Sequence, residues 1–202
     1  MGCGNVKQFP VYQKDEYPEC VNLTFKVDDR KIIPDAKYFD DNETLIHCKV
    51  FQISSVAVHM GEYIVGIAIT LKVNGKDKAL QHIGSGAVID TEKLYMEPFE
   101  HIEHIKCTYS QDGLHSLEFK TNTERTLQSI GNVGEGEEVR ELDLKEQDKA
   151  LIGFRGCFKE HIYDIFAYIA VRLDILNDAA DDDDLALMEA EGEEDFDPAE
   201  RV

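Results

Sequence analysis

The sequence predicts an all-β domain, and three observations lead to that prediction. Turn signals recur roughly every ten residues between short β-branched segments, as they do in sandwiches, barrels and prisms. Residues 115–121 alternate cleanly, with Leu117 and Phe119 on one face and Glu118 and Lys120 on the other. That period of two is typical of a half-buried strand. A motif of two isoleucines three residues apart also occurs three times.

Each copy of this motif follows an aromatic residue or a histidine. The copies are Ile64/Ile67 in YIVGIAI, Ile102/Ile105 in HIEHIKCTY and Ile162/Ile165 in HIYDIFAYI. Because internal repeats fix an architecture, the three copies predict threefold internal symmetry. The third copy lies in the apolar stretch Leu151–Val171. A helix is the alternative for residues 161–173, but the β-branched and aromatic side chains there favour a strand.

The chain of 202 residues is long enough for one ordinary domain with two flanks. We expect an N-terminal arm over residues 1–37, a domain over 38–173 and an acidic tail over 174–202. The arm carries three prolines and one strand-like piece, Val21–Val27. Within the domain, Asn74-Gly75 predicts a tight hairpin turn, because both residues tolerate positive φ.

The net charge of −20 is concentrated at the C-terminal end. Residues 173–202 carry 13 acidic residues and one arginine, a net of −12. A chain this acidic is a poor nucleic-acid binder, because phosphate contacts need Lys and Arg. The tail has two interpretations. Leu185, Leu187 and Met188 could form a short amphipathic patch that docks on a partner, or the tail only solubilises the chain.

The N-terminal residues and the cysteines bound the compartment. The sequence begins MGCGNVKQFP, without the hydrophobic region of a secretory signal, so we expect a cytoplasmic protein that is not secreted. The five cysteines form no C-x-x-C pair, so we expect neither disulfides nor zinc, and no cofactor. Acylation at Gly2 and Cys3 would add a membrane anchor, although Val6 stands where the motif has Ser or Thr.

Four segments of the chain, in order, are YFDDNE, HIGSG, SLEFKTNTERTLQSIG and GFRG followed by HIYDIFAYIAV. The last of them resembles the closing hairpin of the jacalin-like lectin domain family, in which a Gly-Phe-x-Gly turn precedes a tyrosine-rich last strand. The other three resemble further segments of that family, and the likeness covers Tyr38–Leu173. The resemblance implies a β-prism of three four-stranded Greek-key sheets about a pseudo-threefold axis, flanked by the irregular N-terminal arm and the acidic C-terminal tail.

The resemblance also implies where a sugar would bind. The family presents a Gly-x-x-x-Asp loop and a Gly-rich N-terminal loop to sugar hydroxyls. Here Lys159 replaces the glycine, Tyr163 replaces the aspartate, and Asp164 stands one residue late, where a strand would point it to the other face. The first repeat keeps Gly61 but has Val65 in place of the acid. The second has Phe99 in place of the glycine and keeps a carboxylate at Glu103.

These departures favour a non-catalytic interaction or scaffold module in an intracellular assembly, with protein partners bound through the arm and the tail. The first alternative is a lectin whose site is rearranged on the 156–164 loop, with a glycan as partner. The second alternative is an adaptor that is anchored to a membrane by acylation at Gly2 and Cys3. Association with the cytoskeleton or with a membrane stays open as a localisation. No catalytic constellation and no metal site is predicted, since His101 and His104 would lie on opposite faces of a strand. The lectin alternative assigns sugar binding to Lys159, Glu160, His161, Tyr163, Asp164 and Gly84.

Overall fold

The computed structural model confirms the all-β prediction. It describes residues 18–24, 33–46, 51–73, 76–132, 134, 136, 138–147 and 149–171. One short helix, α1 (Asn42–Leu45), accompanies twelve strands in these residues. The strands are β1 (Glu19–Asn22), β2 (Lys37–Asp40), β3 (Phe51–Met60), β4 (Ile64–Val73), β5 (Lys76–Ile83), β6 (Asp90–Tyr95), β7 (Ile102–Ser110), β8 (Gly113–Thr121), β9 (Thr126–Ile130), β10 (Glu138–Asp143), β11 (Lys149–Phe158) and β12 (Ile162–Val171).

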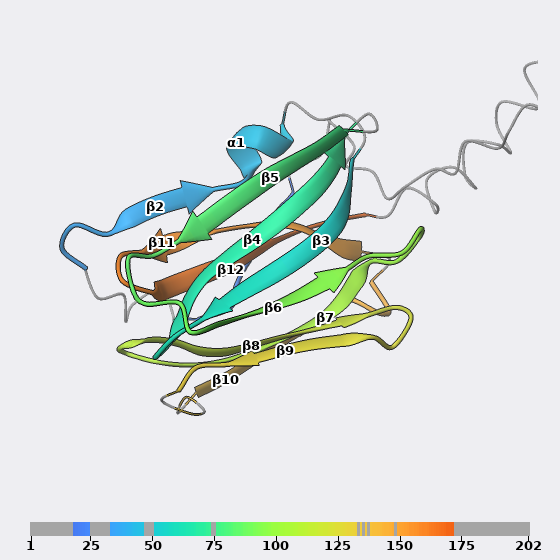
Figure 1. The fold of residues 1–202 in the computed structure, drawn as a ribbon. Helices are drawn as coiled ribbons and strands as arrows, with labels where there is room; N and C mark the ends of the chain where they lie inside the picture. Colours follow the sequence, from blue (N-terminus) through green and yellow to red (C-terminus); the bar gives the residue numbers. More distant parts are fainter. Residues whose placement is uncertain are drawn as a thin grey trace, which may run out of the picture.

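The strands form three four-stranded antiparallel sheets (Figure 1). Sheet A has the order β1-β12-β11-β2, sheet B the order β5-β4-β3-β6, and sheet C the order β10-β7-β8-β9. In sheets B and C, four consecutive strands run through the same Greek-key order, and in sheet A the first two and last two strands complete it. The β-prism of three Greek-key sheets is therefore confirmed.

Sheet A begins earlier in the chain than the expected domain start at residue 38. β1 lies inside the segment expected to be an irregular arm, and it pairs with β12 from Glu19↔Ile169 to Asn22↔Phe166. The strand-like pattern of residues 21–27 is the sequence signal for it, although the strand itself spans Glu19–Asn22. The prism thus includes part of the 1–37 segment, because sheet A needs β1 as its fourth strand.

The isoleucine pairs mark β-bulges. Two residues three apart in a regular strand point to opposite faces, yet Ile162 and Ile165 are both fully buried. An extra residue at Tyr163 resolves this, because the β11–β12 register jumps from Cys157↔Asp164 to Phe158↔Ile162. The β3–β4 register shifts in the same way and leaves Val65 as the extra residue in a bulge of β4. The β7–β8 register also shifts and leaves His115 as the extra residue in a bulge of β8.

One of the three copies does not obey the symmetry. Sheet order makes β4, β8 and β12 equivalent, whereas the Ile102/Ile105 pair lies on β7, the neighbour of β8. The symmetric counterpart on β8 is Leu114/Leu117, and both of these residues are fully buried. The pair on β7 also straddles a register shift, between Ile102 and His104. The motif therefore indicates a bulge in a core strand. The prediction that the Ile102/Ile105 copy is symmetric with the other two is wrong, because it lies on β7 rather than on β8.

Within residues 161–173, for which a helix was the alternative, Ile162–Val171 form the strand β12. Its residues pair with β11 from Lys149↔Val171 to Phe158↔Ile162. The predicted Asn74-Gly75 turn lies outside the described residues, but β4 and β5 pair up to Val73↔Lys76 on either side of it, as a tight hairpin requires. None of the helices among the described residues has the length and apolar content that a membrane crossing needs.

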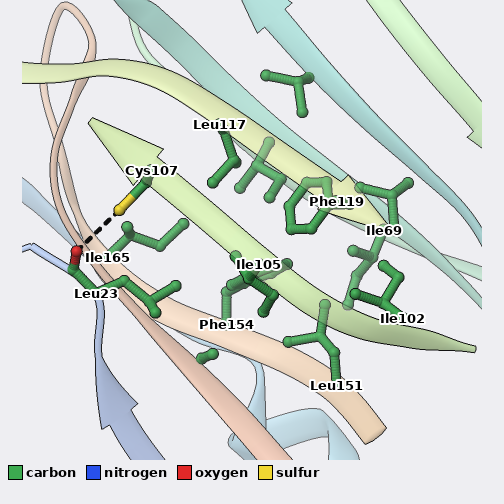
Figure 2. Packing of buried hydrophobic residues seen from close by; sticks show 14 of the residues in the cluster. Leu23, Ile69, Ile102, Ile105, Cys107, Leu117, Phe119, Leu151, Phe154 and Ile165 are labelled. Carbon is green, nitrogen blue, oxygen red and sulfur yellow. Dashed lines mark hydrogen bonds between the residues drawn. The ribbon is translucent and has the colours of Figure 1, made fainter. Parts of the chain in front are cut away.

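A core drawn from all three sheets fills the prism (Figure 2). Phe119 of β8 and Phe154 of β11 are fully buried, with ring centroids 5.9 Å apart. Burial of a large apolar side chain contributes about 1.5–3 kcal/mol to folding. Cys107 donates its Sγ–H to the Leu23 carbonyl at 2.9 Å, and burial raises the pKa of this thiol to about 12. We therefore interpret Cys107 as a core residue rather than a reactive thiol.

Candidate functional site

The hairpin turns of the three sheets lie together at one end of the prism, called here the loop end. β3 and β4 turn at residues 61–63, β7 and β8 at 111–112, and β11 and β12 at 159–161. The loop between β5 and β6, residues 84–89, lies at the same end, because Ser85 and Gly86 donate their N–H groups to carbonyls of the 159–161 turn. Antiparallel hairpins in equivalent sheets turn at the same level, so the symmetry itself assembles this surface.

Aromatic rings from the three hairpins stack on one another at the loop end. The His161 ring lies between Tyr63, at 4.3 Å between centroids, and Tyr163, at 4.2 Å. Tyr63 also meets His115 edge-on at 5.0 Å. Tyr63, His161 and Tyr163 are partly exposed, whereas His115 is buried. The three partly exposed rings form a shelf, called here the aromatic shelf, and aromatic faces of this kind pack against the apolar face of a ring-shaped ligand.

The shelf depends on one glycine. A Cβ on Gly113 would lie 2.6 Å from the His161 ring, and its φ of +150° disfavours other residues. Because the glycine leaves room, His161 can donate from Nε2 to the Asp112 carbonyl at 2.6 Å. Burial lowers the pKa of His161, although the Asp112 carbonyl opposes this. The imidazole is therefore neutral at pH 7 and bridges two hairpin turns.

A second close approach fixes the 159–161 turn. The Ser85 N–H donates to the Lys159 carbonyl at 2.8 Å, and the Gly86 N–H donates to the Glu160 carbonyl at 2.8 Å. A Cβ on Gly84 would come within 2.3 Å of that Glu160 oxygen. Gly84 therefore lets the two loops touch through their backbones, which holds the Glu160 backbone in a defined position.

The side chain of Glu160 is a charged acceptor at the edge of the shelf. Its carboxylate accepts from the Tyr163 hydroxyl at 3.1 Å, and Lys159 Nζ lies 3.8 Å away. The pKa of Glu160 is lowered by its own backbone N–H and then by the Tyr163 hydroxyl and the Lys159 charge. Burial, followed by the bond to Glu160, raises the pKa of Tyr163 to about 12. At pH 7 the site therefore presents an ionised carboxylate beside a neutral phenol.

The predicted sugar-binding residues divide into two groups. Lys159, Glu160, His161 and Tyr163 lie together at the loop end, and Gly84 contacts their turn. Asp164 does not join them. Its carboxylate accepts from Thr24 Oγ1 at 2.5 Å, beside β1, because the bulge at Tyr163 sends the next side chain to the other face of β12.

Sequence reasoning missed Tyr63, Asp112 and His115 as parts of this site. Tyr63 comes from the β3–β4 hairpin, and Asp112 and His115 come from the β7–β8 hairpin, so no local pattern links them to His161. A signal does exist: if the apolar pairs of β4, β8 and β12 are aligned, Tyr63 and Gly113 take the place of His161. The glycine at the middle position is then the one that leaves room for the imidazole.

The predicted lipidation residues, the acidic tail and the histidines considered for metal binding lie away from this site or outside the described residues. Gly2 and Cys3 lie outside the described residues, as do the whole acidic tail, residues 174–202, and the last two residues of the expected domain, 172 and 173. Within the part of the chain that the structure describes, no group of three or more His, Cys, Asp and Glu side chains could hold a metal ion. His101 precedes β7, and its backbone N–H donates to Asn122 Oδ1 at 3.0 Å.

Comparisons with known proteins agree with this architecture. The Calystegia sepium agglutinin structure aligns with a TM-score of 0.58 and 15% identity over 77% of this chain and 98% of its own. Malaysian banana lectin and an artocarpin–mannotriose complex each align with a TM-score of 0.51 and 21% identity, over 59% of this chain and 83% of theirs. No curated protein sequence matches the chain. The jacalin-like lectin domain matches residues 35–168, well over half of the sequence, and the chain therefore belongs to the jacalin-like lectin domain family.

Proposed function

We propose that this chain is a non-catalytic carbohydrate-binding protein whose site is the aromatic shelf with Glu160 at its edge. One observation carries the proposal: three partly exposed rings and an ionised carboxylate are held together at the prism end where the 84–89 loop and the 159–161 turn meet. The family resemblance assigns sugar binding to this end, through a glycine-led loop that corresponds to residues 159–163.

The chemistry of a sugar matches this arrangement. A hexose has an apolar face of C–H groups, which packs on an aromatic ring, and an edge of hydroxyls, which hydrogen-bond to charged acceptors. Tyr163 supplies the ring in place of the family aspartate. Glu160, three residues earlier, supplies the carboxylate. The 3.1 Å hydrogen bond from the Tyr163 hydroxyl to this carboxylate holds the ring and the acceptor next to each other. Such a shelf favours a terminal sugar residue over the middle of a chain, because it is open on one side.

A glycan array with the full chain tests the proposal. We expect binding above background that Tyr163→Ala abolishes and that the matched substitution Tyr95→Ala, on sheet B, leaves unchanged. Tyr95 is 63% exposed and lies outside the loop end, so it controls for the loss of a surface tyrosine. Failure of the folded chain to bind any glycan would overturn the proposal and return attention to protein partners.

A second pair of variants tests the carboxylate. Glu160→Gln keeps the size of the side chain but replaces a charged acceptor, so affinity should fall about tenfold, since a hydrogen bond to a charged group contributes about 1.5–3 kcal/mol. Glu92→Gln on the exposed strand β6 is the control and should bind like the parent chain. Equal affinity of the parent and Glu160→Gln would remove Glu160 from the site.

The interaction-module hypothesis rests on the 1–37 arm and the 174–202 tail. Of these residues, only 18–24 and 33–37 are described, and β1 of the first group is a strand of sheet A. The carbohydrate proposal does not use these flanks and rests on the loop end alone.

A further inference from the structure

The outer face of sheet A carries a pocket of about 480 Å³ that is separate from the aromatic shelf. It is lined by residues of β2, β11 and β12 and by Glu43 of α1. Arg155 and Phe166 pair across β11 and β12, while the adjacent pair Phe154 and Ala167 is fully buried in the core. Because side chains alternate along a strand, Arg155 and Phe166 face outward into this pocket.

Arg155, which lines the pocket, packs against the ring of Phe166. The Arg155 guanidinium lies 4.6 Å above the centre of the Phe166 ring, and it also interacts with Tyr168 and Asp40. A guanidinium held by an aromatic ring and by a hydrogen bond to the Tyr168 hydroxyl is a pre-organised donor, since little side-chain entropy remains to be lost when a ligand binds. The pocket therefore offers a fixed set of N–H donors.

Carboxylates at the edges supply the acceptors. Asp164 is held by the Thr24 hydroxyl at 2.5 Å, and Thr24 Oγ1 in turn accepts the Ile165 N–H at 3.1 Å. Asp40 and Glu43 also line the pocket. The lining thus supplies both donors and acceptors, which is what a vicinal pair of hydroxyls requires, because each hydroxyl both donates and accepts.

The charge of the lining limits which ligands fit. Asp40, Glu43 and Asp164 contribute three carboxylates, against the one guanidinium of Arg155. The remaining cationic candidate, His82, is already paired with the buried carboxylate of Asp41 at 2.6 Å. An excess of negative charge disfavours an anionic ligand and accepts a neutral or cationic one.

The rim adds an apolar face. Tyr38 is 79% exposed and lies on β2 beside the pocket, so its ring can cover a bound ligand. The volume lies within the range of small-ligand pockets, about 300–1,000 Å³, and exceeds that of one six-membered sugar ring. The size, the ring at the rim and the paired donors and acceptors all fit a hydroxylated ring.

We propose that this pocket, called here the sheet A pocket, is a second saccharide site that binds a neutral or amine-bearing sugar residue and rejects carboxylated and phosphorylated sugars. The bulge in β12 explains how two sites arise side by side: Tyr163 points to the shelf and Asp164 to the pocket. The sheet A pocket shares no residue with the shelf, so it does not depend on the proposed function of the loop end.

Glucose and two derivatives, each of which differs from glucose at one carbon, test the proposal. Glucose, glucosamine and glucuronate are titrated separately into the ¹⁵N-labelled full chain, and amide shifts are followed at Tyr38, Arg155 and Asp164. We expect glucose and glucosamine to shift these amides and glucuronate to bind at least about tenfold more weakly, because its charge opposes the lining. Tyr38→Ala and Glu43→Gln should weaken pocket binding several-fold to about tenfold.

Tyr95→Ala and Glu92→Gln are the matched controls and should leave pocket binding unchanged. Both test residues, Tyr38 and Glu43, are exposed, so their variants should fold. Pocket shifts that persist in Tyr163→Ala would uphold this site even if the shelf binds nothing. Shifts confined to the loop end would overturn the sheet A pocket and leave the proposed function intact. Equal binding of glucuronate and glucose at the pocket would overturn the charge selection.

Discussion

The two ends of the prism differ in whether their glutamate carboxylates are buried or exposed. At the end opposite the loop end, called here the closed end, the loop 96–101 meets the β8–β9 turn, residues 121–125, around Glu100, whose side chain is fully buried. It accepts from the Thr121 and Thr123 hydroxyls at 2.7 Å each, from Arg125 at 2.7 Å and from the Glu97 N–H at 2.7 Å. At the loop end, Glu160 is exposed, and its carboxylate accepts a hydrogen bond from the Tyr163 hydroxyl.

The difference separates structural from functional carboxylates. A buried carboxylate with four donors has its hydrogen-bonding capacity used inside the protein, so it stabilises the fold and offers nothing to a ligand. An exposed carboxylate beside open rings contributes little to folding and remains accessible. If this distinction is right, substitutions at the closed end should change stability, and substitutions at the loop end should change binding.

The largest effect should come from Glu100→Ala. Removing the carboxylate leaves two hydroxyls and a guanidinium without their acceptor, so the free energy of unfolding should fall by about 3–5 kcal/mol. Urea denaturation followed by circular dichroism measures it. Glu97→Ala is the matched control: Glu97 is 73% exposed and 3.8 Å from the same arginine, so it should cost less than about 1 kcal/mol. Similar losses in both variants would contradict the account of the closed end.

A smaller loss is expected for Gly84→Ala at the loop end. The new Cβ would overlap the Glu160 carbonyl oxygen, and the backbone must shift, at a cost of about 1–3 kcal/mol. Ser85→Ala serves as the control, since it removes only a 3.4 Å hydroxyl contact on an exposed residue. Gly84→Ala should also weaken sugar binding, because the 159–161 turn moves. An unchanged unfolding midpoint would show that the two loops are not in backbone contact.

The closed end should also carry part of the acid sensitivity. Burial opposes ionisation of Glu100, but the Glu97 N–H, the two threonine hydroxyls and Arg125 outweigh it and lower its pKa. A carboxyl whose pKa is lowered on folding stabilises the protein above its ordinary value of 4.5, and that contribution is lost as the pH falls through the folded value. Urea midpoints at pH 7, 5 and 3 should therefore converge for the parent chain and Glu100→Gln. Parallel curves would refute this assignment.

The smallest stability change is expected for Tyr163→Ala. Its ring is partly exposed and its stacking on His161 contributes about 0.5–1.5 kcal/mol, so the protein should stay folded with a slightly lower midpoint. Tyr95→Ala, with the same change in size on an exposed strand, gives the baseline for this comparison. A collapse of the fold in Tyr163→Ala would make the shelf a structural element like Glu100.

The residues alone predicted an all-β domain, because strand signals are local, and the resemblance to the jacalin-like lectin domain family predicted the β-prism. Alternation over residues 115–121 and the apolar run of β12 both became strands where expected. The alignment of the second repeat failed for a physical reason: β7 and β8 are both core strands with a bulge, so each carries two apolar residues three apart. Position in a Greek key, which no local pattern encodes, distinguishes them.

The candidate site was only half accessible to sequence reasoning. Lys159, Glu160, His161 and Tyr163 are neighbours along the chain, so a family-like loop identified them together. Tyr63 and His115 reach the same surface from other hairpins, and the four donors of Glu100 come from two segments that lie far apart in the chain. Contacts between distant segments follow from the closure of the prism, and they are visible only once the three sheets are placed.

The most direct test of the central claim is the affinity of the full chain for its best array glycan, measured by calorimetry in three forms under conditions where all are folded. The parent chain and Glu100→Gln should bind with the same affinity, and Tyr163→Ala should not bind measurably. Retained binding in Tyr163→Ala together with loss in Glu100→Gln would place recognition at the closed end and contradict the account.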